Sequence, residues 1–298
     1  MTLQPAPAAW LPGVEAYLKR EDGHELGAFK WRAAMPVVEA YRAAGHDAVV
    51  TASTGNHGAA TAWAAARCGL RAVVFVPRDA SPPKLELLRR LRAEVVETGA
   101  DLDEAKAAAL DRAREDGIPF FEDGAEPLQY DAYGGIADEI VAELTPAAVV
   151  VPVGNGALLA GIGRRLAERA PGAVRVGVVA AAAPVMRQSF VARRPVESDE
   201  SRTFADGMAV RVAIPAAVKA LLGAADEMVE VSEHAIAEAV RDFAAAGMRV
   251  EGSAAASLAG ARAMSDRLPG PVVLIVTGRN IDDETWRRAV ERPDSFAR

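Results

Sequence analysis

The run Ala147-Ala-Val-Val-Val-Pro-Val153 passes through Gly154-Asn155-Gly156-Ala157-Leu158 into the helical pattern Leu159–Ala170. A continuous apolar run, a loop of small residues and a helix, in that order, are typical of a βα unit in a parallel sheet. The loop presents backbone N–H groups and the positive end of a helix dipole, which suits a phosphate group. The dinucleotide-binding pattern does not fit, because Leu159 stands where that pattern needs glycine. The alternative is a loop whose glycines serve close packing only.

The same alternation of apolar runs and helical patterns continues along the chain, which predicts the α/β class with two open, twisted, mainly parallel sheets flanked by helices. The stretch 191–215 is the least regular, and long loops in such proteins are often functional. Asp123–Pro127 is predicted to be a loop. The predicted strands are Asp47–Thr51, Arg71–Pro77, Glu94–Thr98 and Ile118–Phe121 in one group and Ala147–Val153, Val174–Val179, Glu227–Val231 and Pro271–Thr277 in the other, with helices at about 57–68, 82–92, 101–116, 233–246 and 254–267.

Composition excludes several classes of protein. Of 298 residues 51% are hydrophobic, so the chain can bury a large core. It has no apolar stretch of roughly 18 residues and no signal-peptide pattern, so we expect a cytoplasmic protein without a membrane segment. A net charge of −7 without a basic, aromatic-rich run argues against nucleic-acid binding. Cys68 is the only cysteine, which excludes an intrachain disulfide, and we expect it to be buried on a helix.

Lys30 lies between Phe29 and Trp31. An amine that must lose its proton near neutral pH gains from an apolar surrounding that removes water, so this position indicates chemistry. The alternative is a surface lysine whose stem covers apolar side chains.

Two further segments carry polar groups at the ends of predicted strands. Ser53–Gly58 (Ser-Thr-Gly-Asn-His-Gly) joins a strand to a helix, so its hydroxyls and N–H groups could hold a carboxylate, and Asn56 could bind a phenolic oxygen. Thr277 places a hydroxyl at the carboxyl end of a parallel strand, where ligand sites of α/β proteins lie. The alternative for Ser53–Gly58 is an ordinary cap and turn. Amine, phosphate loop, carboxylate site, amide and hydroxyl together describe a pocket for pyridoxal 5'-phosphate and an amino acid.

These segments resemble the fold type II pyridoxal-phosphate-dependent enzymes, whose fold is similar to tryptophan synthase β, and within them the threonine/serine dehydratase and serine racemase branch. The resemblance covers nearly the whole chain in the expected order. It rests on Lys19-Arg-Glu-Asp22 with Gly27-Ala-Phe-Lys30, on Ser53–Gly58, on Gly154–Leu158, on Thr203-Phe-Ala-Asp-Gly-Met-Ala-Val210 and on Glu251-Gly-Ser253.

The resemblance implies roles for these residues. Lys30 holds the cofactor as a Schiff base and removes the α-proton, with Ser53 and Thr54 as the other catalytic residues. Thr277 faces the pyridine nitrogen. The substrate-binding residues are Ser53, Thr54, Gly55, Asn56 and His57, and the cofactor-binding residues are Phe29, Lys30, Asn56, Gly154, Asn155, Gly156, Ala157, Leu158 and Thr277.

The chain departs from the family in four ways that bear on function. The family's usual Thr-Pro-Leu near the N-terminus is absent and the segment before Lys19 is short, which bears on the entrance to the site and on substrate preference. Asn155 and Ala157 replace two of four consecutive glycines in the phosphate loop. The stretch Ala180–Gln188 contains no carboxylate where serine racemases hold a divalent ion, so we predict no metal there. Thr54 adds a hydroxyl where dehydratases commonly have alanine, and Ser-Thr-Gly-Asn also resembles threonine synthases.

The predicted function is a lyase that eliminates the β-hydroxyl of a small amino acid of the threonine/serine type, giving a 2-oxo acid and ammonia. An amino acid racemase or a β-replacement, threonine-synthase-like enzyme is the first alternative, and a cofactor-binding protein without turnover is the second. The resemblance further implies a small mobile domain, 43–126, inserted into a larger cofactor-binding domain of 1–42 and 127–298, and a homodimer. Because the chain ends soon after Thr277, we expect no C-terminal regulatory domain.

Overall fold

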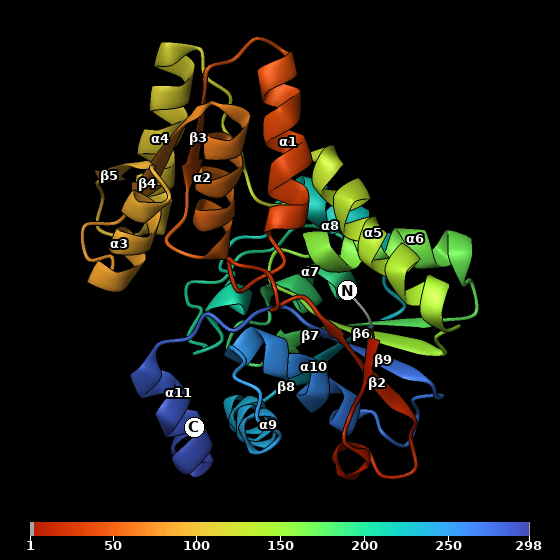
Figure 1. Cartoon of the computed structure of the whole chain (residues 1–298). Coiled ribbons are helices and arrows are strands. Elements are labelled where there is room, and N and C mark those ends of the chain that lie inside the picture. The colour runs from red at the N-terminus through yellow and green to blue at the C-terminus, as the bar shows by residue number, and fades with distance from the viewer. Residues whose placement is uncertain (1–2, 298) are drawn as a thin grey trace. The chain divides into compact units, whose positions relative to one another are not determined.

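The computed structural model describes residues 3–297, in which two separate sheets organise two units (Figure 1). The first unit comprises residues 1–29 and 133–298, and the second comprises residues 30–132. The predicted α/β class with two mainly parallel sheets is confirmed. The predicted boundaries, 43–126 against 1–42 and 127–298, stay a prediction, and residues 1–2 and 298 of that larger domain lie outside the described part of the chain.

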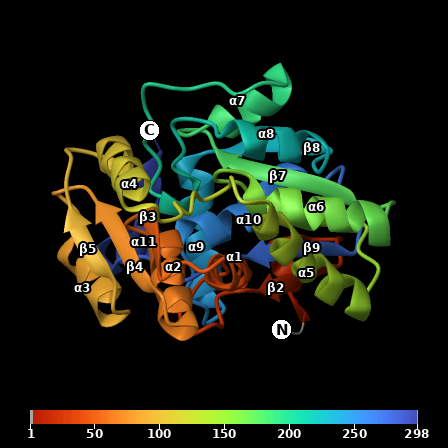
Figure 2. The ribbon, with the colours of Figure 1, turned by 90° about the horizontal axis from the view of Figure 1, so that it is seen from above.

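The second unit is a three-stranded parallel sheet with helices on both faces. Apolar, β-branched residues fill the middle strand on both sides, as buried parallel strands require. Figure 2 shows α4 on one face of this sheet and α2 and α3 on the other, with α1 packed beside α2. The strands are β3 (Ala48–Ala52), β4 (Arg71–Val76) and β5 (Glu94–Glu97), and the helices are α1 (Trp31–Ala43), α2 (Asn56–Cys68), α3 (Pro82–Arg90) and α4 (Leu102–Asp116).

The predicted fourth strand of this unit, Ile118–Phe121, is wrong. The segment makes a single bridge, between Val50 and Phe120. Val50 donates its N–H to the carbonyl of Pro119 and accepts the N–H of Phe121. Proline has no N–H of its own, so a regular ladder cannot continue through it. The segment nevertheless runs parallel to β3, and its continuation, Phe121–Gly124, therefore emerges at the carboxyl end of that strand.

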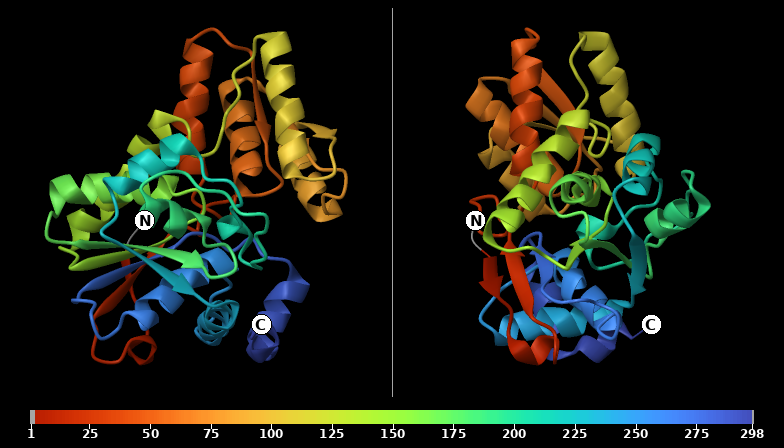
Figure 3. Two further views of the ribbon diagram at one scale, coloured as in Figure 1. Left: turned by 180° about the vertical axis from the view of Figure 1, so that it is seen from behind. Right: turned by 90° about the vertical axis from the view of Figure 1, so that its right-hand side faces the viewer.

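The first unit contains a six-stranded sheet in the order β1-β2-β9-β6-β7-β8, antiparallel only at β1. Figures 1 and 3 show α9 and α10 on one face of this sheet and α5 and α6 on the other. The strands are β1 (Leu3–Pro5), β2 (Ala16–Arg20), β6 (Ala148–Pro152), β7 (Val174–Ala180), β8 (Glu227–Val231) and β9 (Val272–Val276). The helices are α5 (Pro127–Glu143), α6 (Ala157–Arg169), α7 (Val185–Ala192), α8 (Pro215–Leu222), α9 (Glu233–Ala245), α10 (Gly252–Ala263) and α11 (Asp283–Glu291), with short 3-10 turns at Ala8–Trp10, Asp206–Met208 and Pro293–Phe296.

Strands β1 and β2 were not predicted from the sequence. β2 carries Lys19 in its interior, which reads as a polar position, yet that side chain is fully buried. Its amine lies 2.5 Å from a carboxylate oxygen of Glu139 and 3.3 Å from Glu21. A buried lysine is tolerated only when it is paired, and here the two carboxylates supply that pairing.

The irregular stretch 191–215 matches its prediction. Between the end of α7 and the start of α8 the chain forms only the 3-10 turn Asp206–Met208 and one bridge, Glu197 to Val212. Cys68 is buried at the last position of α2, as expected. Within residues 3–297, none of the helices has both the length and the apolar character needed to cross a membrane.

Candidate active site

Lys30 occupies the N-cap position of α1, and its backbone carbonyl accepts the N–H of Ala34. Phe29 is buried against Tyr133, with ring centroids 5.1 Å apart, and Trp31 meets the edge of Trp63. Phe29 and Trp31 therefore pack against other aromatic rings of the protein. The side chain of Lys30 retains 16% exposure.

The amine of Lys30 contacts a carboxylate, which its aromatic neighbours in sequence did not predict. Its Nζ donates to Oδ2 of Asp123 at 2.5 Å. The other oxygen, Oδ1, accepts from Nε2 of Gln129 at 3.0 Å, and Oε1 of Gln129 accepts the N–H of Gly124 at 2.8 Å. Gln129 thus fixes the orientation of the carboxylate that the amine contacts.

The sequence analysis missed Asp123. Burial opposes the ionisation of its carboxyl group, but the charge of Lys30, the nearby His57 and two hydrogen bonds outweigh that effect. The pKa of Asp123 consequently lies well below its usual range. Its place two residues after the predicted strand Ile118–Phe121 is the signal that could have identified it, because ligand sites gather at the carboxyl ends of parallel strands.

The Ser53–Gly58 segment forms the entry into α2. Gly55 is the N-cap and provides no side-chain acceptor for the first N–H groups of the helix. Ser53 Oγ accepts the N–H of Gly55 at 3.1 Å, which leaves its hydroxyl proton to donate elsewhere. Thr54 is half-buried. Asn56 is the first residue of α2. A helix start with this composition can accept a carboxylate.

His57 is buried within the second unit. Its Nε2 lies 3.2 Å from the carbonyl oxygen of Phe121, and the centroids of the two rings are 4.5 Å apart in an edge-on arrangement. Its Nδ1 lies 3.8 Å from Asp123 Oδ1. Burial is the main cause that lowers the pKa of His57, with Lys30 adding to it against the opposing effect of Asp123. A neutral imidazole in this position supports the loop around Asp123. That His57 binds substrate stays a prediction.

The predicted phosphate loop belongs to the first unit and leads from β6 into α6. Gly156 is the N-cap of α6 with φ of 94°, a conformation that favours glycine. A Cβ on Gly154 would lie 2.2 Å from the carbonyl oxygen of Gly207. The two glycines that remain therefore stand where glycine is needed, whereas Asn155 and Ala157 have ordinary backbone angles. Asn155 Oδ1 accepts the N–H of Ala157 at 3.0 Å.

The Thr203–Val210 stretch, which contains Gly207, is held by a carboxylate that the sequence analysis did not single out. Glu233, at the start of α9, accepts from the hydroxyl of Thr203 at 3.1 Å and from the N–H of Phe204 at 2.9 Å. Burial raises the pKa of Glu233, and these two hydrogen bonds oppose the rise. Glu233 thereby fixes the loop on which Gly154 packs.

Thr277 lies directly after β9 and is buried. Its Oγ1 donates to Oε1 of Glu251 at 3.3 Å, and its carbonyl accepts the N–H of Phe29 at 3.1 Å. The second bond fixes the backbone immediately before Lys30 to the end of β9. Thr277 lies at the end of a strand, as predicted, whereas the sequence did not predict its hydrogen bond with Glu251.

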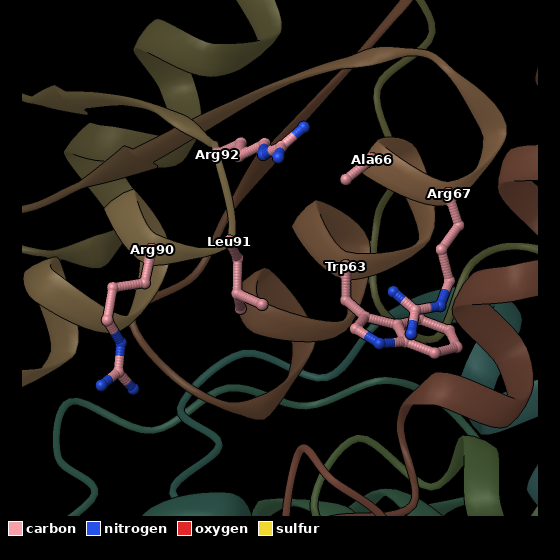
Figure 4. A pocket seen from close by; sticks show the side chains of 6 residues that line it. All are labelled: Trp63, Ala66, Arg67, Arg90, Leu91 and Arg92. Carbon is pink, nitrogen blue, oxygen red and sulfur yellow. The ribbon is translucent and has the colours of Figure 1, made fainter.

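One surface hollow of about 280 Å³ opens on the second unit (Figure 4). Arg67 lies over the ring of Trp63, 4.2 Å from its centroid. The remaining lining residues are Ala66, Arg90, Leu91 and Arg92. None of these is a predicted site residue, and exposed arginines form an ordinary solvated surface.

The residues present fit pyridoxal 5'-phosphate. Lys30 is an amine with part of its side chain exposed, α6 starts with a glycine loop whose N-cap has no side-chain cap, and Thr277 supplies a hydroxyl. Each group matches one chemical feature of the cofactor: aldehyde, phosphate and ring nitrogen. Among residues 3–297, no cluster of three or more His, Cys, Asp or Glu side chains is arranged to hold a metal ion.

Comparison with known proteins agrees with this chemistry. The family described as "Pyridoxal-phosphate dependent enzyme" matches residues 2–278. An L-threonine ammonia-lyase of Geobacter sulfurreducens is 36% identical over 285 residues, which cover 94% of this chain and 71% of that protein. Several longer threonine dehydratases also match, and the chain spans only 48% to 57% of their length.

Many solved structures share the fold, and two serve as examples. The processed form of threonine deaminase isoform 2 from Solanum lycopersicum superposes with a TM-score of 0.88 at 30% identity, covering 95% of this chain and 84% of that one. Maize serine racemase gives a TM-score of 0.89 at 22% identity, covering 99% of this chain and 93% of that one, a likeness of fold alone.

Proposed function

The chain belongs to the family of pyridoxal-phosphate dependent enzymes, and from that premise we propose that it is an ammonia-lyase of the threonine/serine dehydratase type. It eliminates the β-hydroxyl of a small amino acid and yields a 2-oxo acid and ammonia. The observation that carries the proposal is the likeness of nearly the whole chain to an L-threonine ammonia-lyase, together with the partly exposed amine of Lys30.

Each polar group has one role in this proposal. The cofactor, when bound, withdraws electrons from the α-carbon of the substrate. The start of α2, with Ser53, Thr54 and Asn56, orients the substrate carboxylate, because its first N–H groups have no side-chain cap. The loop from Gly154 to Leu158 holds the phosphate at the start of α6.

Lys30 moves the proton. Its neutral amine removes the α-proton, and the resulting ammonium donates that proton to the departing β-hydroxyl, which leaves as water. Thr277 would face the ring nitrogen of the bound cofactor, and since its hydroxyl donates to Glu251, its oxygen would accept only from a protonated nitrogen.

The experiment is a measurement of ammonia and 2-oxo acid from L-threonine, L-serine and 3-hydroxyaspartate with purified, cofactor-loaded protein. We expect both products in equal amounts from at least one of the three. The absence of 2-oxo acid with every substrate would contradict the proposal. Lys219→Ala, an exposed lysine in α8, is the matched control for Lys30→Ala.

Racemisation is the second candidate, and the hydroxyl of Thr54 favours it. Thr54 follows Ser53 at the entry to α2, and a second hydroxyl there could return a proton to the opposite face of the α-carbon. Chiral analysis of recovered amino acid, with Thr54→Ala beside the parent, distinguishes the two reactions. Racemisation that Thr54→Ala removes while elimination continues would support this candidate.

We also propose that the protein acts as a cytoplasmic homodimer and that residues 43–126 form a small mobile domain. Support comes from the resemblance to fold type II enzymes and from the absence of a membrane-spanning helix in residues 3–297. Light scattering on the purified protein tests the dimer. A mass of one 31.2 kDa chain at micromolar concentration would contradict it.

A further inference from the structure

We propose that Glu233 is a positioning residue for the cofactor. By holding Thr203 and Phe204 it sets the place of the loop from Gly154 to Leu158, and thereby the affinity of the protein for the phosphate group. Glu233 acts through the segment 203–208 and needs no contact with the cofactor. The inference rests on the proposed function, in which that loop binds the phosphate, and it adds a residue outside the predicted site.

One carboxylate oxygen of Glu233 fixes the beginning of this segment. Oε2 accepts the hydroxyl of Thr203 at 3.1 Å and the N–H of Phe204 at 2.9 Å. The hydroxyl oxygen of Thr203 in turn accepts the N–H of Ala205 at 3.0 Å. Glu233 belongs to α9 and lies 29 and 30 positions further along the chain than its two donors, so a regular helix anchors an otherwise irregular segment. Hydrogen bonds to a charged acceptor are stronger than neutral ones.

The carboxyl group of Glu233 is present although burial works against it. The residue is 8% exposed, and among residues 3–297 its other oxygen, Oε1, has no hydrogen-bond partner. Burial also raises the pKa of Glu233. A buried carboxyl with an unpaired oxygen lowers stability, and such a departure from the rules of packing is expected where a group serves a function.

The segment passes its position on to the phosphate loop because no space is left on either side of it. The N–H of Met208 donates to the carbonyl of Ala205 at 2.7 Å, which closes the 3-10 turn that contains Gly207. On one side, a Cβ on Gly154 would lie 2.2 Å from the carbonyl oxygen of Gly207. On the other, a Cβ on Gly207 would lie 2.7 Å from Oγ of Ser253. Close-packed groups transmit displacements, so a shift at Ala205 also shifts Gly154.

A displaced loop holds a phosphate group less tightly. Gly156 is the N-cap of α6 and provides no side-chain acceptor for the first N–H groups of that helix, a helix start that suits an anion. Hydrogen bonds from N–H groups weaken steeply when their distance and angle depart from the optimum. The effect of Glu233 is thereby directed at the phosphate group, whereas the aldehyde and the ring of the cofactor depend on other residues.

Other contacts keep the segment within the fold when Glu233 is changed. The ring of Phe204 packs against that of Phe296, with centroids 4.4 Å apart. A Cβ on Gly252, at the start of α10, would lie 2.9 Å from Cε2 of Phe204. Loss of the carboxylate should therefore shift the segment rather than release it, and cofactor affinity is the property that reports the shift.

The test compares two ligands that differ in the phosphate group alone, pyridoxal 5'-phosphate and pyridoxal. Equilibrium dialysis of the full-length chain, freed of cofactor, gives a dissociation constant for each, and the ratio of the two measures the contribution of the phosphate. Damage to the fold as a whole weakens the binding of both ligands, whereas a shifted phosphate loop weakens only that of the first. This readout does not require turnover.

In Glu233→Ala we expect the dissociation constant for pyridoxal 5'-phosphate to rise about tenfold, the size expected when a hydrogen bond to a charged group is lost, and that for pyridoxal to stay unchanged. Glu233→Gln keeps an oxygen that can accept from Thr203 and Phe204 and should restore most of the affinity. Glu238→Ala is the matched control, since Glu238 also belongs to α9 but pairs with Arg241.

Thr203→Val removes one donor to Glu233 and serves as a second variant if Glu233→Ala does not fold, which circular dichroism checks. It should give a smaller rise in the same dissociation constant. The inference is overturned if the folded variant binds pyridoxal 5'-phosphate like the parent, or if it loses affinity for both ligands equally. If the parent itself binds pyridoxal 5'-phosphate no more tightly than pyridoxal, the phosphate loop of the proposed function fails, and the two failures are thereby told apart.

Discussion

The two units hold their parts of the predicted site by different means. In the second unit, side-chain contacts hold the site: the amine of Lys30 donates to Asp123, and Gln129 and His57 lie against the other oxygen of that carboxylate. In the first unit, backbone geometry dominates: Gly154 packs against Gly207, and Gly156 adopts a positive φ. The stability of charge pairs depends on pH, whereas close backbone contacts are disrupted when a substitution adds side-chain atoms. The two regions should therefore fail under different perturbations.

The largest expected effect is that of Lys30→Ala, which removes the amine that contacts Asp123. We expect no covalent attachment of the cofactor at this position and a loss of ammonia release of about 10³-fold or more, since both the nucleophile and the proton carrier are gone. Mass spectrometry after borohydride reduction and a coupled ammonia assay measure the two effects. Full activity in this variant would contradict the role of Lys30 in the reaction and in cofactor attachment.

A change in the backbone region should affect cofactor affinity without altering pH dependence. In Gly154→Ala the new Cβ would lie 2.2 Å from the Gly207 carbonyl, so the phosphate loop has to shift. We expect the dissociation constant for pyridoxal 5'-phosphate to rise about 30-fold, which corresponds to about 2 kcal/mol. Equilibrium dialysis at two pH values measures it. Gly172→Ala, where a Cβ meets nothing within 4 Å, is the control and should bind like the parent.

Thr277 tests whether the first unit also depends on a side-chain hydrogen bond, because its hydroxyl donates to Glu251. Thr277→Val removes the donor to the buried Glu251 carboxylate and should lower the free energy of unfolding by about 1.5 kcal/mol. Urea unfolding followed by circular dichroism gives this value. Thr277→Ser keeps the hydroxyl and should lose markedly less, and equal losses in both variants would show that packing, not the hydrogen bond, is responsible.

The smallest expected effect is a pH dependence confined to the second unit. The pKa of His57 is lowered in the folded protein, so the unfolded chain binds a proton more readily. The associated stability is present above about pH 6.5, the ordinary imidazole value, and is lost as the pH falls below it. Hydrogen exchange of the β3 and β4 amides should therefore accelerate, after correction for intrinsic rates, between pH 7 and 5.5.

His57→Gln should flatten that dependence, since glutamine does not titrate in this range. Amides of β6 and β9 in the first unit serve as the internal reference. An equal acceleration in β6 and β9 would contradict the assignment of this pH response to the second unit.

The sequence predicted strands β3 to β9 and helices α2, α3, α4, α6, α9 and α10 closely, because apolar, β-branched runs followed by helical patterns leave few other folds. It did not predict helices α1, α5, α7, α8 and α11. It did not predict β2, whose Lys19 is buried by pairing with Glu139, a partner 120 positions away. It also predicted a strand at Ile118–Phe121, where Pro119 limits pairing to one bridge. Both errors arise where contacts distant in sequence override local preference.

The sequence by itself determined the α/β class, the family and the identities of the groups suited to the cofactor, since residue type and order suffice for these. Only the tertiary structure decided that a carboxylate, Asp123, faces the amine of Lys30, and that Glu251 and Glu233 hold Thr277 and Thr203. The reason is physical. Electrostatic and hydrogen-bonding partners are set by distances of a few ångströms between residues far apart in the chain, and such distances exist only once the chain is folded.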